Sequence, residues 1–247
     1  MSEDGINDEA ADRFRTLSII VPVFNERSTV AEIVRRMRSV ELPVEREIVV
    51  VDDGSDDGTA DVLTQLRDST VRVLRHHENR GKGAAIRTGL ESATGDLVLV
   101  QDADLEYDPA DYPRLLEPFE RRGAEVVYGT RSFSSHTAYS FWFVMGNKAV
   151  TLWSNLLFNS YLSDLETGYK VMPLSTWRSL DLQANGFDIE PEITAKLLRA
   201  GHRIYEVPIS YAARTREEGK KLTWQDGVKA VWTLGRIRLG PRAARRV

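Results

Sequence analysis

The densest group of chemically useful side chains is the run Gln101–Glu106, which directly follows the apolar residues Leu97–Val100. Asp102, Asp104 and Glu106 stand at positions i, i+2 and i+4 of this run. In an extended chain such residues point to one face. Three carboxylates on one face could bind a hard divalent cation, Mg²⁺ or Mn²⁺, which prefers oxygen ligands. We therefore expect a metal–diphosphate site with these three residues as metal ligands.

The same acidic run also has a purely structural interpretation. Asp108 followed by Pro109 has the pattern of a helix N-cap with proline at the first helical position. Capping requires only one acidic group, so the metal interpretation is favoured for Asp102 and Asp104, and both can hold at once.

Length and composition place the chain among globular proteins. Its 247 residues, 42% of them hydrophobic, can bury a core as one large domain or two tightly packed lobes. The absence of cysteine excludes a disulfide scaffold and thiolate-bound zinc. Because residues 1–15 are polar and acidic, we expect no export and a cytoplasmic location. No apolar run has the roughly 18 to 20 residues of a membrane span, so membrane contact is expected to be peripheral.

Charge is distributed unevenly along the chain. The net charge of −4 divides into +7 on residues 214–247, which hold ten Lys or Arg and three acids, and −11 on the remainder. An acidic main body argues against DNA or RNA as a partner. Trp224, Val228, Val231 and Trp232 recur at helical spacing within the basic segment. This stripe could lie on an anionic membrane surface or pack against the protein's own core.

The first half of the chain alternates strand, loop and helix. This alternation is typical of an α/β fold with a mostly parallel sheet and helices on both faces. The strands are expected at 17–23, 47–51, 71–74 and 96–100, and the helices at 28–40, 59–67 and from Gly83 to near Gly95. Ligands of such sheets bind at the carboxyl ends of the strands. Three polar clusters follow strands here: Phe24–Glu26, Asp52–Asp53 and Asp102–Glu106.

These clusters suit a nucleotide. Asp53 could accept hydrogen bonds from a ribose or a base, with Glu26 on the neighbouring edge. The loop Asn79–Gly83 has glycines before an expected helix start, and Lys82 adds a cation, as an anion site requires. Each loop taken alone could be ordinary turn chemistry. The chain has neither a Walker A loop nor G-x-G-x-x-G, so ATP hydrolysis and NAD chemistry lack motif support.

Taken together, the motifs resemble family 2 glycosyltransferases of the GT-A fold. The matching residues are Val21–Glu26, Val51–Ser55, Gly81–Gly83 and Asp102–Asp104. The resemblance covers residues 17–222 and implies a divided domain, with a nucleotide-sugar half at 17–130 and an acceptor half at 131–222. Residues 1–16 are then a flexible segment, and 223–247 a basic amphipathic helix and tail. The nucleotide-sugar-binding residues that the resemblance implies are Pro22, Phe24, Asn25, Glu26, Val51, Asp53, Lys82, Asp102, Ala103 and Asp104.

Within that family the chain looks most like the dolichyl- or polyprenyl-phosphate hexose synthases. The matching stretches are Tyr128–Arg131, Phe187–Glu192 and Val207–Tyr211 with the basic residues that follow. The resemblance implies a donor of the GDP-mannose or UDP-glucose type and a polyprenyl-phosphate acceptor. It implies acceptor contacts from Arg131, Glu166, Glu190, Arg214, Lys220 and Lys221. Asp102, Asp104, Arg131 and Arg214 are the expected catalytic residues. Many synthases of this group have Gln where this chain has Glu106.

Seven of the 21 aromatic residues lie between Tyr139 and Tyr161. We expect residues 141–143 to be exposed toward a lipid chain or a bilayer interface. Trp153 and Phe158 could serve the same partner or belong to a core helix.

The chemistry of the acceptor separates three hypotheses. A lipid phosphate is already an anion and needs cations, which Arg131 and Arg214 could supply. A hydroxyl acceptor instead needs a general base, for which Asp164, Glu166 and Glu190 are available. A nucleotide-sugar-binding protein without turnover needs neither. We favour the lipid phosphate, on an enzyme peripheral to the cytoplasmic face of a membrane.

Overall fold

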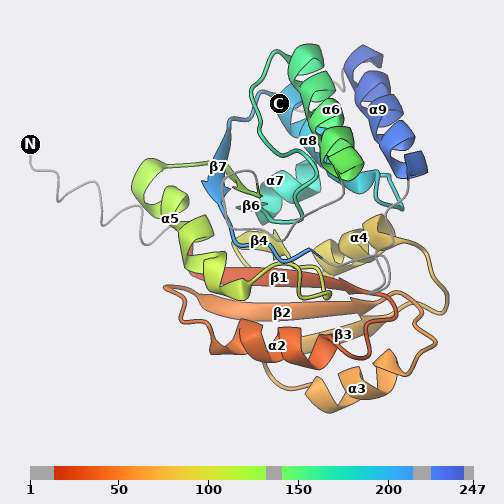
Figure 1. The fold of residues 1–247 in the computed structure, drawn as a ribbon. Coiled ribbons are helices and arrows are strands. Elements are labelled where there is room, and N and C mark those ends of the chain that lie inside the picture. Colours follow the sequence, from red (N-terminus) through yellow and green to blue (C-terminus); the bar gives the residue numbers. More distant parts are fainter. Residues whose placement is uncertain (1–13, 132–140, 214–223, 242–247) are drawn as a thin grey trace, which may run out of the picture.

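A mostly parallel sheet forms the centre of the protein (Figure 1). The computed structural model describes residues 14–131, 141–213 and 224–241. Within these ranges the strands are β1 (Thr16–Val23), β2 (Glu45–Asp52), β3 (Val71–Arg75), β4 (Leu97–Val100), β5 (Val126–Thr130), β6 (Lys170–Pro173) and β7 (Ile204–Pro208). They are ordered β3-β2-β1-β4-β6-β5-β7, and β6 alone among them runs antiparallel to its neighbours. The predicted α/β fold with a mostly parallel sheet is confirmed.

Helices cover both faces of this sheet. They are α2 (Val30–Ser39), α3 (Thr59–Leu66), α4 (Lys82–Ser92), the short 3₁₀ helix η1 (Pro109–Asp111), α5 (Tyr112–Arg122), α6 (Phe141–Phe158), α7 (Leu174–Ser179), α8 (Ile189–Ala200) and α9 (Trp224–Leu239). The Asp108 side chain accepts a hydrogen bond from the Ala110 amide at 3.0 Å, and Pro109 follows it. The predicted N-cap is therefore present.

Strand β1 shows how the two layers arise from sequence. Its side chains alternate between the faces of the sheet, as the pleat of a strand requires. Leu17, Ile19 and Val21 pack with apolar residues of α2 and α5. Ile20 points the other way and packs with residues of α4, α7 and α8. All of these strand side chains are fully buried.

Helices α6 and α9 lie side by side and form an outer layer on α8 (Figure 1). The buried side of α9 consists of Ala230, Thr233, Leu234 and Ile237, which pack with Val150 of α6 and Ala195 of α8. The predicted stripe is a different one. Its four members Trp224, Val228, Val231 and Trp232 are 78%, 59%, 42% and 71% exposed. The alternative that this stripe packs on the protein's own core is therefore wrong.

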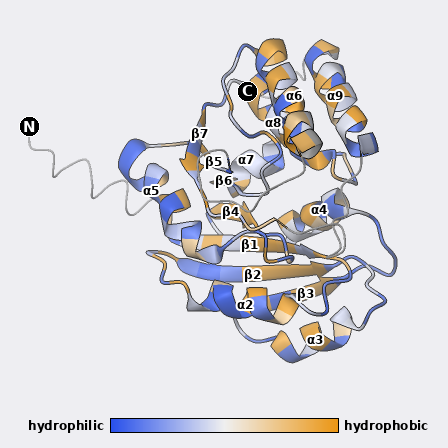
Figure 2. Cartoon of the chain, viewed as in Figure 1, coloured by the Kyte–Doolittle hydropathy of each residue, from blue (hydrophilic) through white to orange (hydrophobic). Residues whose placement is uncertain are grey.

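Helix α6 also has an apolar outer side. Phe141, Met145, Leu152, Trp153 and Leu156 are exposed. Phe158 instead packs against the core cluster under α9, so of the two residues left open by the sequence it takes the core alternative. Figure 2 shows hydrophobic (orange) residues along both α6 and α9. Among the described residues, no helix combines the length and apolarity that crossing a membrane demands.

Candidate functional site

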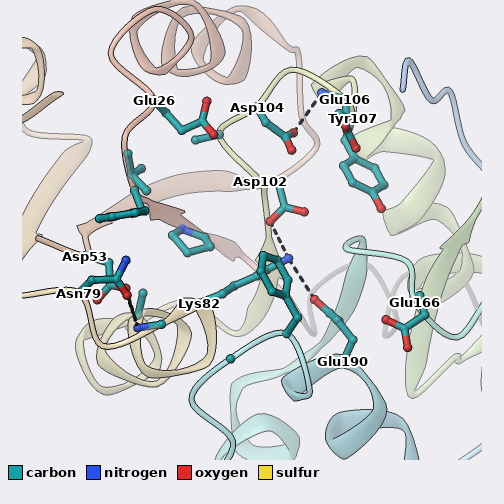
Figure 3. Close-up of a pocket in the computed structure, with 18 of the residues that line it drawn as sticks. Glu26, Asp53, Asn79, Lys82, Asp102, Asp104, Glu106, Tyr107, Glu166 and Glu190 are labelled. Carbon is teal, nitrogen blue, oxygen red and sulfur yellow. Dashed lines mark hydrogen bonds and ion pairs between the residues drawn. The ribbon is translucent and has the colours of Figure 1, made fainter. Parts of the chain in front are cut away.

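A cavity of about 410 Å³ opens at the carboxyl ends of the parallel strands (Figure 3). Strand topology explains which residues meet there. β1, β2, β4, β5 and β7 all end at this edge, and antiparallel β6 begins there. The predicted residues that line the cavity are Pro22, Phe24, Glu26, Asp53, Lys82, Asp102, Ala103, Asp104, Glu106, Arg131, Glu166 and Glu190. Arg214, Lys220 and Lys221 lie outside the described residues.

Two residues expected to bind the nucleotide are not among those that line the cavity. Val51 is fully buried and packs with Val49, Ala85 and Leu74 beneath α4. Its side chain therefore supports the cavity floor and cannot reach a ligand. Asn25 has a left-handed backbone (φ 53°). Its side-chain amide donates to the Asp56 carboxylate at 2.9 Å and accepts the Asp56 backbone amide at 3.1 Å. It shapes the loop that follows β1.

Asp53 organises the loop before α4. Its carboxylate accepts hydrogen bonds from the amides of Arg80 and Gly81 at 3.0 and 2.7 Å. It also bonds Nδ1 of His76 at 2.6 Å, and the other ring nitrogen of His76 bonds Thr88 at 2.9 Å. Sequence reasoning missed His76, because a single histidine after a strand carries no pattern.

The glycines of this loop let its backbone pack closely against residues 184–185. A Cβ at Gly81 or at Gly83 would overlap a backbone carbonyl of residues 184–185. The Gly83 amide donates to the Asn185 carbonyl at 2.7 Å, and the Gly81 amide is taken by Asp53. The predicted anion site at this helix start is therefore not formed by these amides. The remaining anion-binding group is the Lys82 ammonium.

Lys82 belongs to a buried chain of alternating charges. Its Nζ lies 2.7 Å from Oδ1 of Asp102 and 3.2 Å from Oε1 of Glu190 (Figure 3). Oε2 of Glu190 bonds Nζ of Lys170, which is 1% exposed. Burial works against the charged form of Lys82, but Asp102 and Glu190 raise its pKa above the ordinary value. Glu190 is thus held by two lysines.

The three predicted metal ligands each have another partner. Asp102 pairs with Lys82, Asp104 accepts the Glu106 amide at 3.1 Å, and the Glu106 carboxylate accepts the Tyr211 hydroxyl. Within the described residues, no three acidic or histidine side chains converge as a ready-made metal site. Without a bound metal the three carboxylates do not converge in the described residues, and Asp102, Asp104 and Glu106 stay predicted as metal ligands.

The residues nevertheless fit a divalent cation in part. Mg²⁺ is usually held by one or two carboxylates together with substrate phosphates rather than by a cage of protein ligands. Asp102, Asp104 and Glu106 offer hard oxygen donors along one side of a cavity of nucleotide size. Such a site is completed by the phosphates and does not need three converging acids.

Arg131 lines the cavity and is fixed there by a buried carboxylate. Its Nε and Nη2 donate to the two oxygens of Asp164 at 2.6 and 2.7 Å, and its guanidinium lies 5.0 Å from the centre of the Tyr211 ring. Burial would raise the pKa of Asp164, but the charge and hydrogen bonds of Arg131 lower it below its ordinary value. Asp164 is therefore an anchor for Arg131 and no general base. Asn147 of α6 donates to the same carboxylate at 3.1 Å.

Glu166 differs from Asp164 and Glu190, since within the described residues it has no ion-pair partner. No hydrogen bond to its carboxylate is found in the described residues, although it lines the cavity. Burial raises the pKa of Glu166 to about 7, which Lys170 opposes and Glu190 reinforces. Such a carboxyl group can take up or release a proton near neutral pH.

Tyr107 and Tyr211 form part of the cavity wall. Tyr107 lies 4.7 Å from the ring of Tyr169 and 5.1 Å from that of Tyr211. Its hydroxyl accepts the Gly168 amide at 2.8 Å. Tyr107 and Tyr211 also form an antiparallel bridge between the loop after β4 and the segment after β7. Neither was selected as a site residue from the sequence, because tyrosine alone carries no motif signal.

Comparison with known proteins defines the family. Residues 18–178 match the family described as Glycosyl transferase family 2. The chain belongs to this family. The undecaprenyl-phosphate mannosyltransferase of Micrococcus luteus is 32% identical over 213 residues, which cover 81% of this chain and 85% of that protein.

A second relative is longer than this chain. The dolichol-phosphate mannosyltransferase of Pyrococcus furiosus is 28% identical over 209 residues, or 83% of this chain and 58% of that protein. Among solved structures, glucosyl-3-phosphoglycerate synthase of Mycobacterium tuberculosis in complex with Mn²⁺, UDP and glucosyl-3-phosphoglycerate superposes with a TM-score of 0.70. It covers 99% of this chain and 86% of that one at 21% identity, which supports the GT-A fold.

Proposed function

We propose that this glycosyltransferase moves one hexose, with inversion, from a donor of the GDP-mannose or UDP-glucose type to a polyprenyl phosphate. The observation that carries the proposal is the double role of Asp164. Its carboxylate fixes the Arg131 guanidinium in the cavity and also bonds Asn147 of α6. Asp164 thereby connects a cation that can bind a phosphate with a helix whose outer side is apolar. An acceptor with a phosphate head and a lipid chain requires both.

The acceptor phosphate needs no base in this reaction. Its second pKa is about 6, so it is largely a dianion at neutral pH. One phosphate oxygen attacks the anomeric carbon of the donor as the bond from that carbon to the diphosphate breaks, and the electron pair leaves with the nucleoside diphosphate. Arg131 holds the attacking anion against repulsion from the donor diphosphate. Arg214, Lys220 and Lys221 stay predicted as further cations.

The donor side uses residues from three strand ends. Pro22, Phe24 and Asp53 line the part of the cavity assigned to the nucleotide. Asp104, with Asp102 and Glu106, would hold Mg²⁺ or Mn²⁺. When bound, the cation offsets the charge that develops on the leaving diphosphate.

The outer sides of α6 and α9 are assigned to the cytoplasmic surface of a membrane. Their exposed residues include Trp153, Trp224 and Trp232, and tryptophan favours the interface between water and lipid. Lys148 and Lys229 are exposed on the same two helices and suit anionic headgroups. Flotation with anionic vesicles tests this assignment. Trp232→Ser is expected to weaken vesicle binding. The matched control is Tyr205→Ser, which replaces an exposed aromatic residue on β7 and is expected to leave vesicle binding unchanged.

The transfer itself is tested with radiolabelled GDP-mannose and UDP-glucose in the presence of Mn²⁺ and undecaprenyl phosphate. Label that extracts into organic solvent, and is released by mild acid as the free sugar, supports the proposal. Transfer to water-soluble alcohols but never to the lipid phosphate would contradict it.

Glu166 favours a second candidate, a glycosyltransferase with a hydroxyl acceptor. A carboxylate with a pKa of about 7 in the cavity could take the proton of a sugar hydroxyl. Under that reaction Glu166→Gln should lower the rate by roughly 10² to 10⁴, the usual contribution of a general base. With a phosphate acceptor the same substitution should change the rate only slightly.

A further inference from the structure

Lys82 and Asp102 already form an ion pair in the part of the cavity where a divalent cation is expected. Their 2.7 Å contact is largely shielded from water, with the two side chains 14% and 20% exposed. Asp102 therefore has a resident cationic partner. A divalent cation that approaches Asp102 meets the like charge of the ammonium group.

Glu190 holds Lys82 from the other side. It is 3.2 Å from Nζ of Lys82, and its second oxygen bonds Lys170. Lys170 also donates to the carbonyls of Leu165 and Thr167, so it is fixed to the acceptor segment. Because Lys170 matches the charge of Glu190, the charge of Lys82 is balanced mainly by Asp102.

We propose that Lys82 is an exchangeable counter-ion, which leaves Asp102 to a divalent cation only when a nucleotide diphosphate arrives as its new partner. The inference rests on the proposed nucleotide-sugar donor, whose diphosphate supplies that partner. It implies that metal binds weakly without nucleotide and strongly with it. The lysine then keeps the empty site from holding a bare cation.

Replacing Lys82 should therefore act in opposite directions on two ligands. In Lys82→Met, Mn²⁺ alone should bind about ten-fold more tightly, because its competitor is gone. UDP or GDP in saturating Mn²⁺ should bind about ten-fold more weakly, because a charge-assisted contact to phosphate is lost. A merely structural role for Lys82 would weaken both.

Electron paramagnetic resonance of free Mn²⁺ measures the first affinity, and calorimetry with UDP and with GDP measures the second. Lys196→Met is the matched control, since Lys196 pairs with the buried Glu192 at 2.8 Å on α8. Both affinities of the control should equal those of the wild-type protein. Lys82→Met in an Asp102→Asn background should gain less than two-fold in Mn²⁺ affinity, because the contested carboxylate is absent.

Unchanged or weaker Mn²⁺ binding by Lys82→Met overturns the inference. If that variant does not fold, a structure of the wild-type protein with Mn²⁺ and UDP or GDP decides. Lys82 on the diphosphate supports the exchange, and Lys82 still on Asp102 overturns it. Failure of both nucleotides to bind the wild-type protein overturns the exchange together with the proposed donor. If the nucleotides bind but transfer to the lipid phosphate fails, only the proposed acceptor is wrong.

Discussion

The hydroxyl of Tyr211 donates a hydrogen bond to the carboxylate of Glu106 and so joins the segment after β7 to the loop after β4. The backbone repeats the connection, because the Ala212 amide donates to the Glu106 carbonyl at 2.9 Å. Burial, followed by Tyr107 and Glu106, raises the pKa of Tyr211, so its hydroxyl stays a donor. Glu106 is thereby a structural link as well as an expected metal neighbour.

This link predicts different outcomes for two substitutions of Glu106. The side-chain carbonyl of Glu106→Gln can accept the same hydroxyl, so the free energy of unfolding should stay near that of the wild-type protein. Glu106→Ala leaves a buried hydroxyl without its acceptor and should cost about 1–3 kcal/mol. Urea denaturation of both variants measures the difference. Equal stabilities would mean that the Tyr211 contact contributes nothing.

The ion pair of Arg131 and Asp164 predicts linked effects on acceptor use. Arg131→Ala should lower the acceptor-dependent rate about ten- to a hundred-fold through loss of charge-assisted hydrogen bonds. Asp164→Asn should have a similar effect, because the guanidinium loses its two-point anchor. The measurement is initial rate against acceptor concentration at saturating donor. Arg121→Ala, which removes an exposed arginine paired with Glu117 on α5, is the control and should leave the rate unchanged. Near-normal rates for both site variants would refute a phosphate acceptor bound by Arg131.

Local sequence patterns predicted strands β1 to β4, and the family resemblance implied most of the residues that line the cavity. Carboxyl ends of parallel strands converge whatever the details of packing, so Phe24, Asp53 and Asp102 could be assigned together. The Tyr211–Glu106 contact could not be predicted, because it joins residues 105 positions apart through the antiparallel bridge at Tyr107.

Charges were harder to interpret than strands. Glu190 was predicted as an acceptor contact or a general base and Lys170 was assigned no role, yet the two are buried and paired with each other. Helix α9 raised a similar difficulty, since it carries two stripes at helical spacing. Periodicity cannot tell which one faces α6 and α8, and the bulkier stripe with Trp224 and Trp232 is the exposed one.

Asp53 predicts a donor-side defect. Asp53→Ala removes the acceptor for the amides of Arg80 and Gly81, so the loop before α4 loses its fixed position. The affinity for nucleotide in the presence of Mn²⁺ should fall at least ten-fold, about 1.4 kcal/mol or more. The Michaelis constant for the acceptor should change much less. Calorimetry with UDP and GDP gives the first quantity, and an unchanged nucleotide affinity would remove Asp53 from the donor site.

Asp104 predicts loss of catalysis without loss of fold. Asp104 is half-buried in the loop after β4, where its carboxylate accepts the Glu106 amide at 3.1 Å, so Asp104→Ala should unfold at nearly the wild-type urea concentration. Transfer should fall below detection, and the wild-type enzyme should lose activity in a chelator and regain it with added Mn²⁺. Full activity of Asp104→Ala in the presence of the chelator would refute metal dependence.

Glu166 predicts a pH-dependent stability. Burial raises the pKa of Glu166 to about 7, against an unfolded value near 4.3. Between those values the folded protein binds more protons at this site than the unfolded chain does. The contribution of Glu166 to the free energy of unfolding therefore decreases as the pH rises through this window, and it levels off above about pH 7. Glu166→Gln does not titrate, so its stability relative to the wild-type protein should increase from pH 5 to pH 8.

Urea denaturation of the two proteins at both pH values gives this difference directly. Gln183→Glu, which adds a carboxylate at an exposed position in the loop between α7 and α8, is expected to leave the pH dependence as in the wild-type protein. A stability difference that is the same at pH 5 and pH 8 would show that Glu166 titrates at its ordinary pKa in the folded protein.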